Sequence, residues 1–161
     1  MKNSTQRQHL SFLLFLISLM LLPLSATGAD NRFSQLADGT IKDSRTGLTW
    51  AASDNGANIT WLAALHYCQK YSAEKEGEWR MPTPEELATL YGASKSSKGE
   101  EDKYTVDLAT DLIKVSAPWV WSSRKSPNKN AVVYGFNYGN TRKFFRGKGM
   151  NRRALPVKSG K

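Results

Sequence analysis

Cysteine and histidine are scarce in this sequence. Cys68 is the only cysteine among 161 residues, and the two histidines are His9 and His66. A single thiol excludes a fold held together by intrachain disulfides. His9 lies in the N-terminal segment that we expect to be cleaved, so the one remaining histidine excludes a multi-histidine metal site. A nucleophilic pair would need Cys68 and His66, but residues two positions apart on a helix do not face each other. These absences favour a protein that is not an enzyme and uses no metal or other cofactor.

Long apolar runs are also missing, except near the start of the chain. Residues 10–22 are almost wholly apolar, follow a short basic segment and end at Pro23. Small residues at 26–29 then supply a cleavage site for signal peptidase. The run is shorter than the roughly 20 residues that span a bilayer, so a retained anchor is the less favoured alternative. We interpret residues 1–29 as a signal peptide and expect an extracytoplasmic protein, either periplasmic or secreted, with no transmembrane segment after cleavage.

Acidic residues are absent from the last third of the chain. Residues 112–161 contain twelve lysines and arginines, whereas all fourteen aspartates and glutamates lie before Leu112. Such segregation indicates an electropositive face that attracts anions. A solvated basic surface with no partner is the alternative interpretation.

Residues 30–161 are long enough for a single domain with a substantial core. Tryptophans are expected to dominate that core, and no ligand is needed to explain them. They are Trp50, Trp61, Trp79, Trp119 and Trp121.

Turn signals predict strands toward both ends of this domain. Asp38-Gly39 and Thr46-Gly47 predict a meander of short strands between Phe33 and Trp50. A turn at Gly139-Asn140 separates two of the later strands. The expected later strands cover residues 120–123, 131–137, 141–146 and 155–157.

Two helices are expected in the middle of the chain. Thr60 is a suitable N-cap for the first, and apolar residues follow at helical spacing, namely Trp61, Ala64, Leu65 and Cys68. Thr83 to Glu86 predicts a capping box that opens the second helix. We also expect a charged loop at 93–103 and a short helix at 106–115. The fold class is therefore α+β, with two main helices and a mixed or antiparallel sheet that joins the N- and C-terminal strands.

Several short motifs occur in one order along the chain. They are DGTIKD at 38–43, TGLTW at 46–50, YC at 67–68, EWRMPTPEEL at 78–87 and WVWSS at 119–123. In this combination the chain resembles the Lcl C-terminal domain family over nearly all of residues 32–157. The resemblance implies a compact C-type-lectin-like module, related to formylglycine-generating-enzyme-like folds, and it does not imply a catalyst. In the bacterial collagen-like adhesin that gives the family its name, such a domain is associated with sulfated polysaccharide.

The chain departs from the family pattern in one respect. Members often end in a segment whose cysteine could pair with the helical one, but here Arg152-Arg153-Ala154 stands in that place. Cys68 is therefore expected to be a free thiol or to form an intermolecular bridge. Lectin calcium motifs of the EPN or QPD type are also absent, which argues against calcium-dependent sugar binding.

The C-terminal basic residues form the candidate ligand-binding site. They are Arg142, Lys143, Arg146, Lys148, Arg152 and Arg153, interleaved with Phe144 and Phe145. Arginine matches the geometry of sulfate, carboxylate and phosphate, so we expect an anionic polysaccharide or a lipid headgroup as partner. Nucleic acid suits the same composition but is less available to an exported protein. The alternative is an assembly protein whose basic face docks an acidic protein partner.

Overall fold

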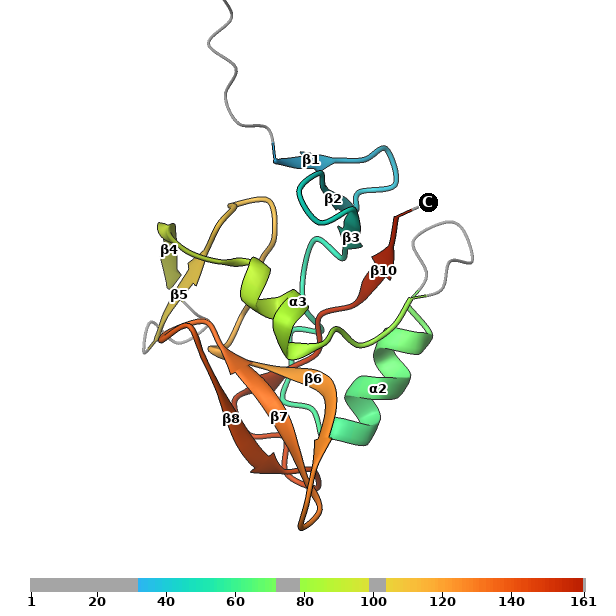
Figure 1. Cartoon of the computed structure of the whole chain (residues 1–161), viewed down its shortest axis with the longest axis vertical. Helices are drawn as coiled ribbons and strands as arrows, with labels where there is room; N and C mark the ends of the chain where they lie inside the picture. The colour runs from blue at the N-terminus through green and yellow to red at the C-terminus, as the bar shows by residue number, and fades with distance from the viewer. Residues whose placement is uncertain (1–31, 72–78, 99–103, 161) are drawn as a thin grey trace, which may run out of the picture. The chain divides into compact units, whose positions relative to one another are not determined.

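The two ends of the domain meet in one sheet, as the sequence predicts. The computed structural model describes residues 32–71, 79–98 and 104–160. In it, β1 (Phe33–Gln35), β2 (Ile41–Asp43) and β3 (Leu48–Trp50) form an antiparallel meander. The last strand, β10 (Val157–Ser159), pairs antiparallel with β3, which gives the order β1-β2-β3-β10 (Figure 1).

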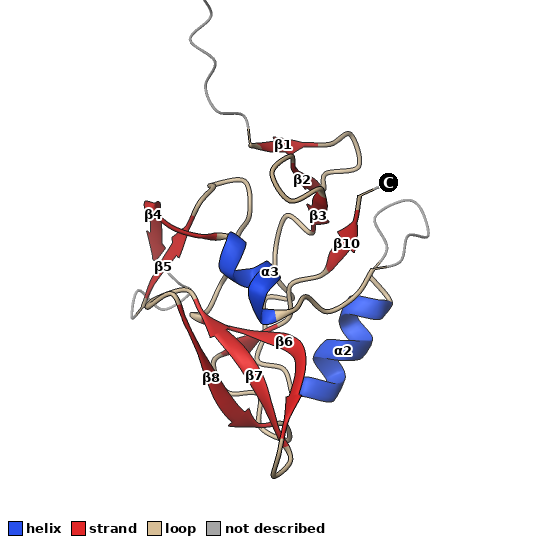
Figure 2. Ribbon diagram, viewed as in Figure 1, coloured by secondary structure: helices blue, strands red, loops and turns tan. Residues whose placement is uncertain are grey.

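A second sheet carries most of the C-terminal third. It consists of β6 (Trp119–Ser126), β7 (Asn130–Gly135), β8 (Asn140–Phe145) and β9 (Arg152–Arg153). The order is β8-β7-β6-β9, with antiparallel pairing except between β6 and β9. Figure 2 shows β6, β7 and β8 as neighbouring strands. Among the described strands β8 pairs with β7 alone, so it lies at the edge of this sheet.

The two predicted helices are confirmed. The first, α2 (Trp61–Gln69), begins at the N-cap Thr60 and buries Trp61, Ala64 and Cys68. The second, α3 (Pro84–Thr89), begins with the predicted capping box, in which the Thr83 hydroxyl accepts from the Glu86 amide. The Glu86 carboxylate accepts in return from the Thr83 amide at 2.8 Å, so two free backbone donors of the helix start are satisfied.

Two other expectations of secondary structure are wrong. Residues 106–115 do not form a helix, because β5 (Thr105–Leu108) pairs with β4 (Tyr91–Lys98) in a separate two-stranded sheet. Val106 and Leu108 are buried while Asp107 between them is half-buried, which is the two-residue period of a strand. The expected loop at 93–103 is also a strand as far as residue 98, and its remaining residues, 99–103, lie outside the described part.

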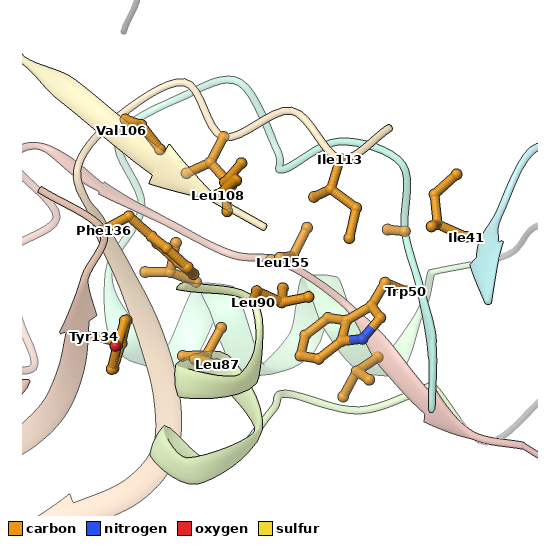
Figure 3. Close-up of a cluster of buried hydrophobic side chains, with 14 of the residues drawn as sticks. Ile41, Trp50, Leu87, Leu90, Val106, Leu108, Ile113, Tyr134, Phe136 and Leu155 are labelled. Carbon is orange, nitrogen blue, oxygen red and sulfur yellow. The ribbon is translucent and has the colours of Figure 1, made fainter. Parts of the chain in front are cut away.

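Two hydrophobic cores lie on opposite faces of the second sheet. One contains Trp50, Leu87 and Phe136 and packs α3 against the sheet (Figure 3). The other packs α2 through Trp61 and Cys68. Burial raises the pKa of the Cys68 thiol to about 12, because a thiolate is poorly solvated there. Neighbouring residues of one strand thus point into different cores, which fixes the register of the sheet between two helices.

The predicted signal peptide, residues 1–29, lies outside the described residues. In the part of the chain that the structure describes, no helix has the length and apolar character needed to cross a membrane.

Candidate functional site

Basic residues gather where β8 ends beside the start of α2. In the pairing of β7 with β8, Asn130 lies opposite Phe145. The next residue, Arg146, donates its amide to the carbonyl of Lys129 at 3.0 Å, so Lys129 and Arg146 are neighbours. The Trp61 amide donates to the Arg146 carbonyl at 3.0 Å. These bonds hold the first turn of α2 against the end of the second sheet.

Two cations, Lys125 and Arg146, lie close to the Trp61 indole ring. The Lys125 ammonium lies 5.5 Å from the ring centroid, and the Arg146 guanidinium carbon lies 5.6 Å from it. Both distances fall within the reach of a cation–π interaction. The indole itself is fixed, because its Nε1 donates to the Ser122 carbonyl at 2.9 Å. Two positive charges are therefore positioned beside one rigid ring.

These positive charges have no counter-charge within the part of the chain that the structure describes. Among the residues that the structure describes, Lys125, Lys129 and Arg146 form no ion pair. The buried Nε of Arg146 also finds no hydrogen-bond acceptor within that part of the chain. Like charges held close together raise the local positive potential, which attracts an anion.

Strand β8 extends the basic surface away from Trp61. Side chains alternate along a strand, so Arg142 and Phe144 share one face while Lys143 and Phe145 share the other. The Arg142 guanidinium lies 5.5 Å from the centroid of the Trp119 ring, whereas Lys143 is exposed. Of the two phenylalanines, Phe144 packs against the α2 core and Phe145 stays 48% exposed.

Arg152 does not extend this exposed surface, although the sequence analysis includes it in the site. It is buried, and its guanidinium lies 3.9 Å from the Phe144 centroid and 5.4 Å from the Trp121 centroid. Burial lowers the pKa of Arg152 from its ordinary value. The physical reason for its position is that β9 pairs beside β6, inside the fold, and brings the side chain between two aromatic rings.

Arg153 is also buried, on a different set of partners. Its Nε donates to the Ser116 hydroxyl at 2.6 Å, and its Nη1 donates to the Asn58 side-chain oxygen at 2.7 Å. The same Nε lies 4.0 Å from a carboxylate oxygen of Asp54. Arg153 therefore joins the loop before α2 to the end of the chain, and its side chain lies away from the end of β8.

The exposed set of cations differs in part from the predicted one. We use the name β8 cationic surface for the exposed and half-buried cations on both faces of β8 and around its end. They are Lys125, Lys129, Arg142, Lys143, Arg146 and Lys148. Sequence reasoning found the last four and missed the first two. Lys125 lies near the end of β6 and Lys129 in the turn that follows, and antiparallel pairing through β7 brings both beside the end of β8.

A groove of about 470 Å³ opens within this surface. Its lining residues are Thr60, Trp61, Leu62, Lys129, Phe145, Arg146 and Gly147. Leu62 and Phe145 are 56% and 48% exposed, so the groove combines apolar walls with cations. A Cβ at Gly147 would lie 2.6 Å from the Phe145 ring, and the glycine therefore leaves room for the ring at this position. The volume is within the range of small-molecule sites.

A smaller cavity of about 150 Å³ lies beside Asn58, Ser116 and Arg153. Arg153 donates a hydrogen bond to each of the other two side chains, so this cavity borders the contacts of Arg153 described above. The described residues contain no group of three or more His, Cys, Asp or Glu side chains that could hold a metal ion.

A family model described as the Lcl C-terminal domain matches residues 39–158, which run from the first turn of the meander into β10. None of the curated proteins matches the chain.

Proposed function

The chain belongs to the Lcl C-terminal domain family, and on that basis we propose that it is an exported, non-enzymatic module that binds anionic polysaccharide. The observation that carries the proposal is the convergence of Lys125, Lys129 and Arg146 with no acidic partner among the described residues. Sulfate or carboxylate groups on a polymer would supply the missing negative charge and accept hydrogen bonds from the arginine. The pairing of β3 with β10 supports the finer proposal that the fold is C-type-lectin-like.

Glu86 and Cys68 have structural roles, and this supports the non-enzymatic part of the proposal. Glu86 accepts two hydrogen bonds from Arg80, at 2.8 and 2.6 Å. Burial acts to raise the pKa of Glu86, but the hydrogen bonds from Arg80 and Thr83 lower it overall. The Cys68 thiol is buried and protonated at neutral pH. Neither group is placed to act on a substrate.

Chromatography on immobilised heparin tests the binding proposal. We expect the protein to elute at higher salt from heparin than from a cation exchanger of equal charge density. Its affinity should fall steeply with salt, because binding releases counterions condensed on the polyanion. Failure to bind heparin or any other acidic glycan at low salt would contradict the proposal. That result would favour an acidic protein partner, whose interface would also use the apolar side chains Leu62 and Phe145.

Export is tested by the mass of the protein recovered from the periplasm or the medium. The small residues at 26–29 support cleavage there, and the expected N-terminus is Ala29 or Asp30. A recovered protein that retains residues 10–22 would contradict the export proposal.

A further inference from the structure

We propose that the groove beside β8 holds one sugar ring of the bound polymer, a pyranose that carries a carboxylate or sulfate. Recognition then requires a carbohydrate ring in addition to negative charge. This inference rests on the proposed function, because it assigns ring recognition to the same surface. A charged surface alone would need no hollow, yet the β8 cationic surface contains a groove of about 470 Å³.

The apolar wall of the groove is suited to the C–H face of a sugar. Phe145 is 48% exposed and Leu62 is 56% exposed, from different elements that meet at this one site. Apolar area that is exposed to water is unfavourable relative to apolar area that is buried. The neighbouring Phe144 avoids that cost by packing against the α2 core. A ring laid over Phe145 would remove the remaining apolar area from water.

The cations of the groove select the charge of its occupant. Lys129 and Arg146 line the groove together with Phe145, and backbone pairing fixes the two cations side by side. An acidic substituent at the edge of a stacked ring would therefore meet both cations at once. An acyl chain would instead bring apolar carbon against two charged walls, which is unfavourable. Charge complementarity therefore favours an acidic pyranose over a lipid chain.

The test compares a carbohydrate with a polyanion that has no sugar. Chondroitin sulfate oligosaccharide and inorganic polyphosphate are titrated into the full mature protein and into Phe145→Ala, at the same salt. We expect Phe145→Ala to weaken oligosaccharide binding about tenfold, a loss of the size found when an aromatic side chain that stacks on a nucleic-acid base is replaced by alanine. Polyphosphate affinity should change less than about twofold, because the cations remain.

Two further variants control this comparison. Phe145→Tyr keeps the ring and should retain oligosaccharide affinity. Tyr138→Ala removes another exposed aromatic, which is 67% exposed in the turn between β7 and β8 and does not line the groove. It should bind both polymers as the wild type does. Saturation-transfer NMR gives a direct readout, since the C–H protons of the sugar should receive saturation from the wild type and lose it in Phe145→Ala.

The outcomes separate this inference from the proposed function. Equal losses for both polymers in Phe145→Ala, or no loss for either, would overturn ring recognition while oligosaccharide binding to the wild type still supports the function. Phosphatidylglycerol vesicles are a third probe. If Phe145→Ala weakens binding to these vesicles but to neither polymer, the groove holds a lipid chain and the inference is overturned. Absence of oligosaccharide binding by the wild type would overturn both.

Discussion

The variant Arg142→Glu/Lys143→Glu/Lys148→Glu is expected to lose at least about 100-fold in affinity for a sulfated polysaccharide. All three side chains are exposed, and each reversal replaces an attraction to the polymer by a repulsion. Lys143 and Lys148 form no ion pair with any described residue, so their replacement breaks no ion pair among those residues. Titrations at several salt concentrations measure the loss, and the salt dependence of the variant should be shallower.

A matched variant separates the position of the charges from their sum. Lys42→Glu/Lys70→Glu/Lys114→Glu produces the same change in net charge at three exposed sites outside the β8 cationic surface. It should lose far less affinity and keep the wild-type salt dependence. Equal losses in the two triple variants would mean that net charge alone drives binding. Thermal unfolding of both variants shows whether the fold is retained.

Local signals in the sequence predicted local structure well. The capping box at Thr83 and Glu86 and the apolar stripe that buries Cys68 were both confirmed. Each depends on residues within about two helical turns of one another, so their spacing along the chain already contains the geometry. The strand at 105–108 could also have been recognised, because Val106 and Leu108 alternate with the polar residues Thr105 and Asp107.

The candidate site was harder to predict because its contacts are remote in sequence. Arg152 and Arg153 belong to the same basic segment as Lys148, yet both are buried. Arg153 meets the Asp54 carboxylate and Asn58 from a loop almost a hundred residues earlier. A run of cations in the sequence contains no information about such partners. The groove was missed for a related reason, since the start of α2 and the end of β8 form it together.

Removal of Arg32 is expected to destabilise the fold by about 3–5 kcal/mol. In the wild type, its Nε and Nη2 donate to the two oxygens of Asp43 at 2.8 and 2.6 Å. The Asp43 side chain is 0% exposed and that of Arg32 is 11% exposed. Arg32→Ala would therefore leave a carboxylate buried without this partner. Denaturant unfolding at neutral pH measures the change in the free energy of unfolding.

The same pair predicts how the effect depends on pH. Burial acts to raise the pKa of Asp43, but hydrogen bonds from Arg32 and Thr46 and the charge of Arg32 lower it overall. A carboxyl whose pKa is lower in the folded than in the unfolded state stabilises the fold fully above its unfolded pKa of about 3.9. That contribution is lost as the pH falls through the folded pKa. The difference between wild type and Arg32→Ala should therefore be largest at neutral pH and shrink in acid.

Arg124→Ala provides the matched control for the buried pair. Arg124 also binds a carboxylate through its guanidinium, since its Nη2 lies 2.8 Å from Glu85 Oε2 and 2.7 Å from Oε1. Both side chains are exposed, at 53% and 65%, so water screens the charges and solvates the remaining carboxylate. The unfolding midpoint of Arg124→Ala should stay close to that of the wild type. Similar losses in the two variants would contradict this explanation, in which burial of the carboxylate, rather than the number of its hydrogen bonds, determines the cost of removing the arginine.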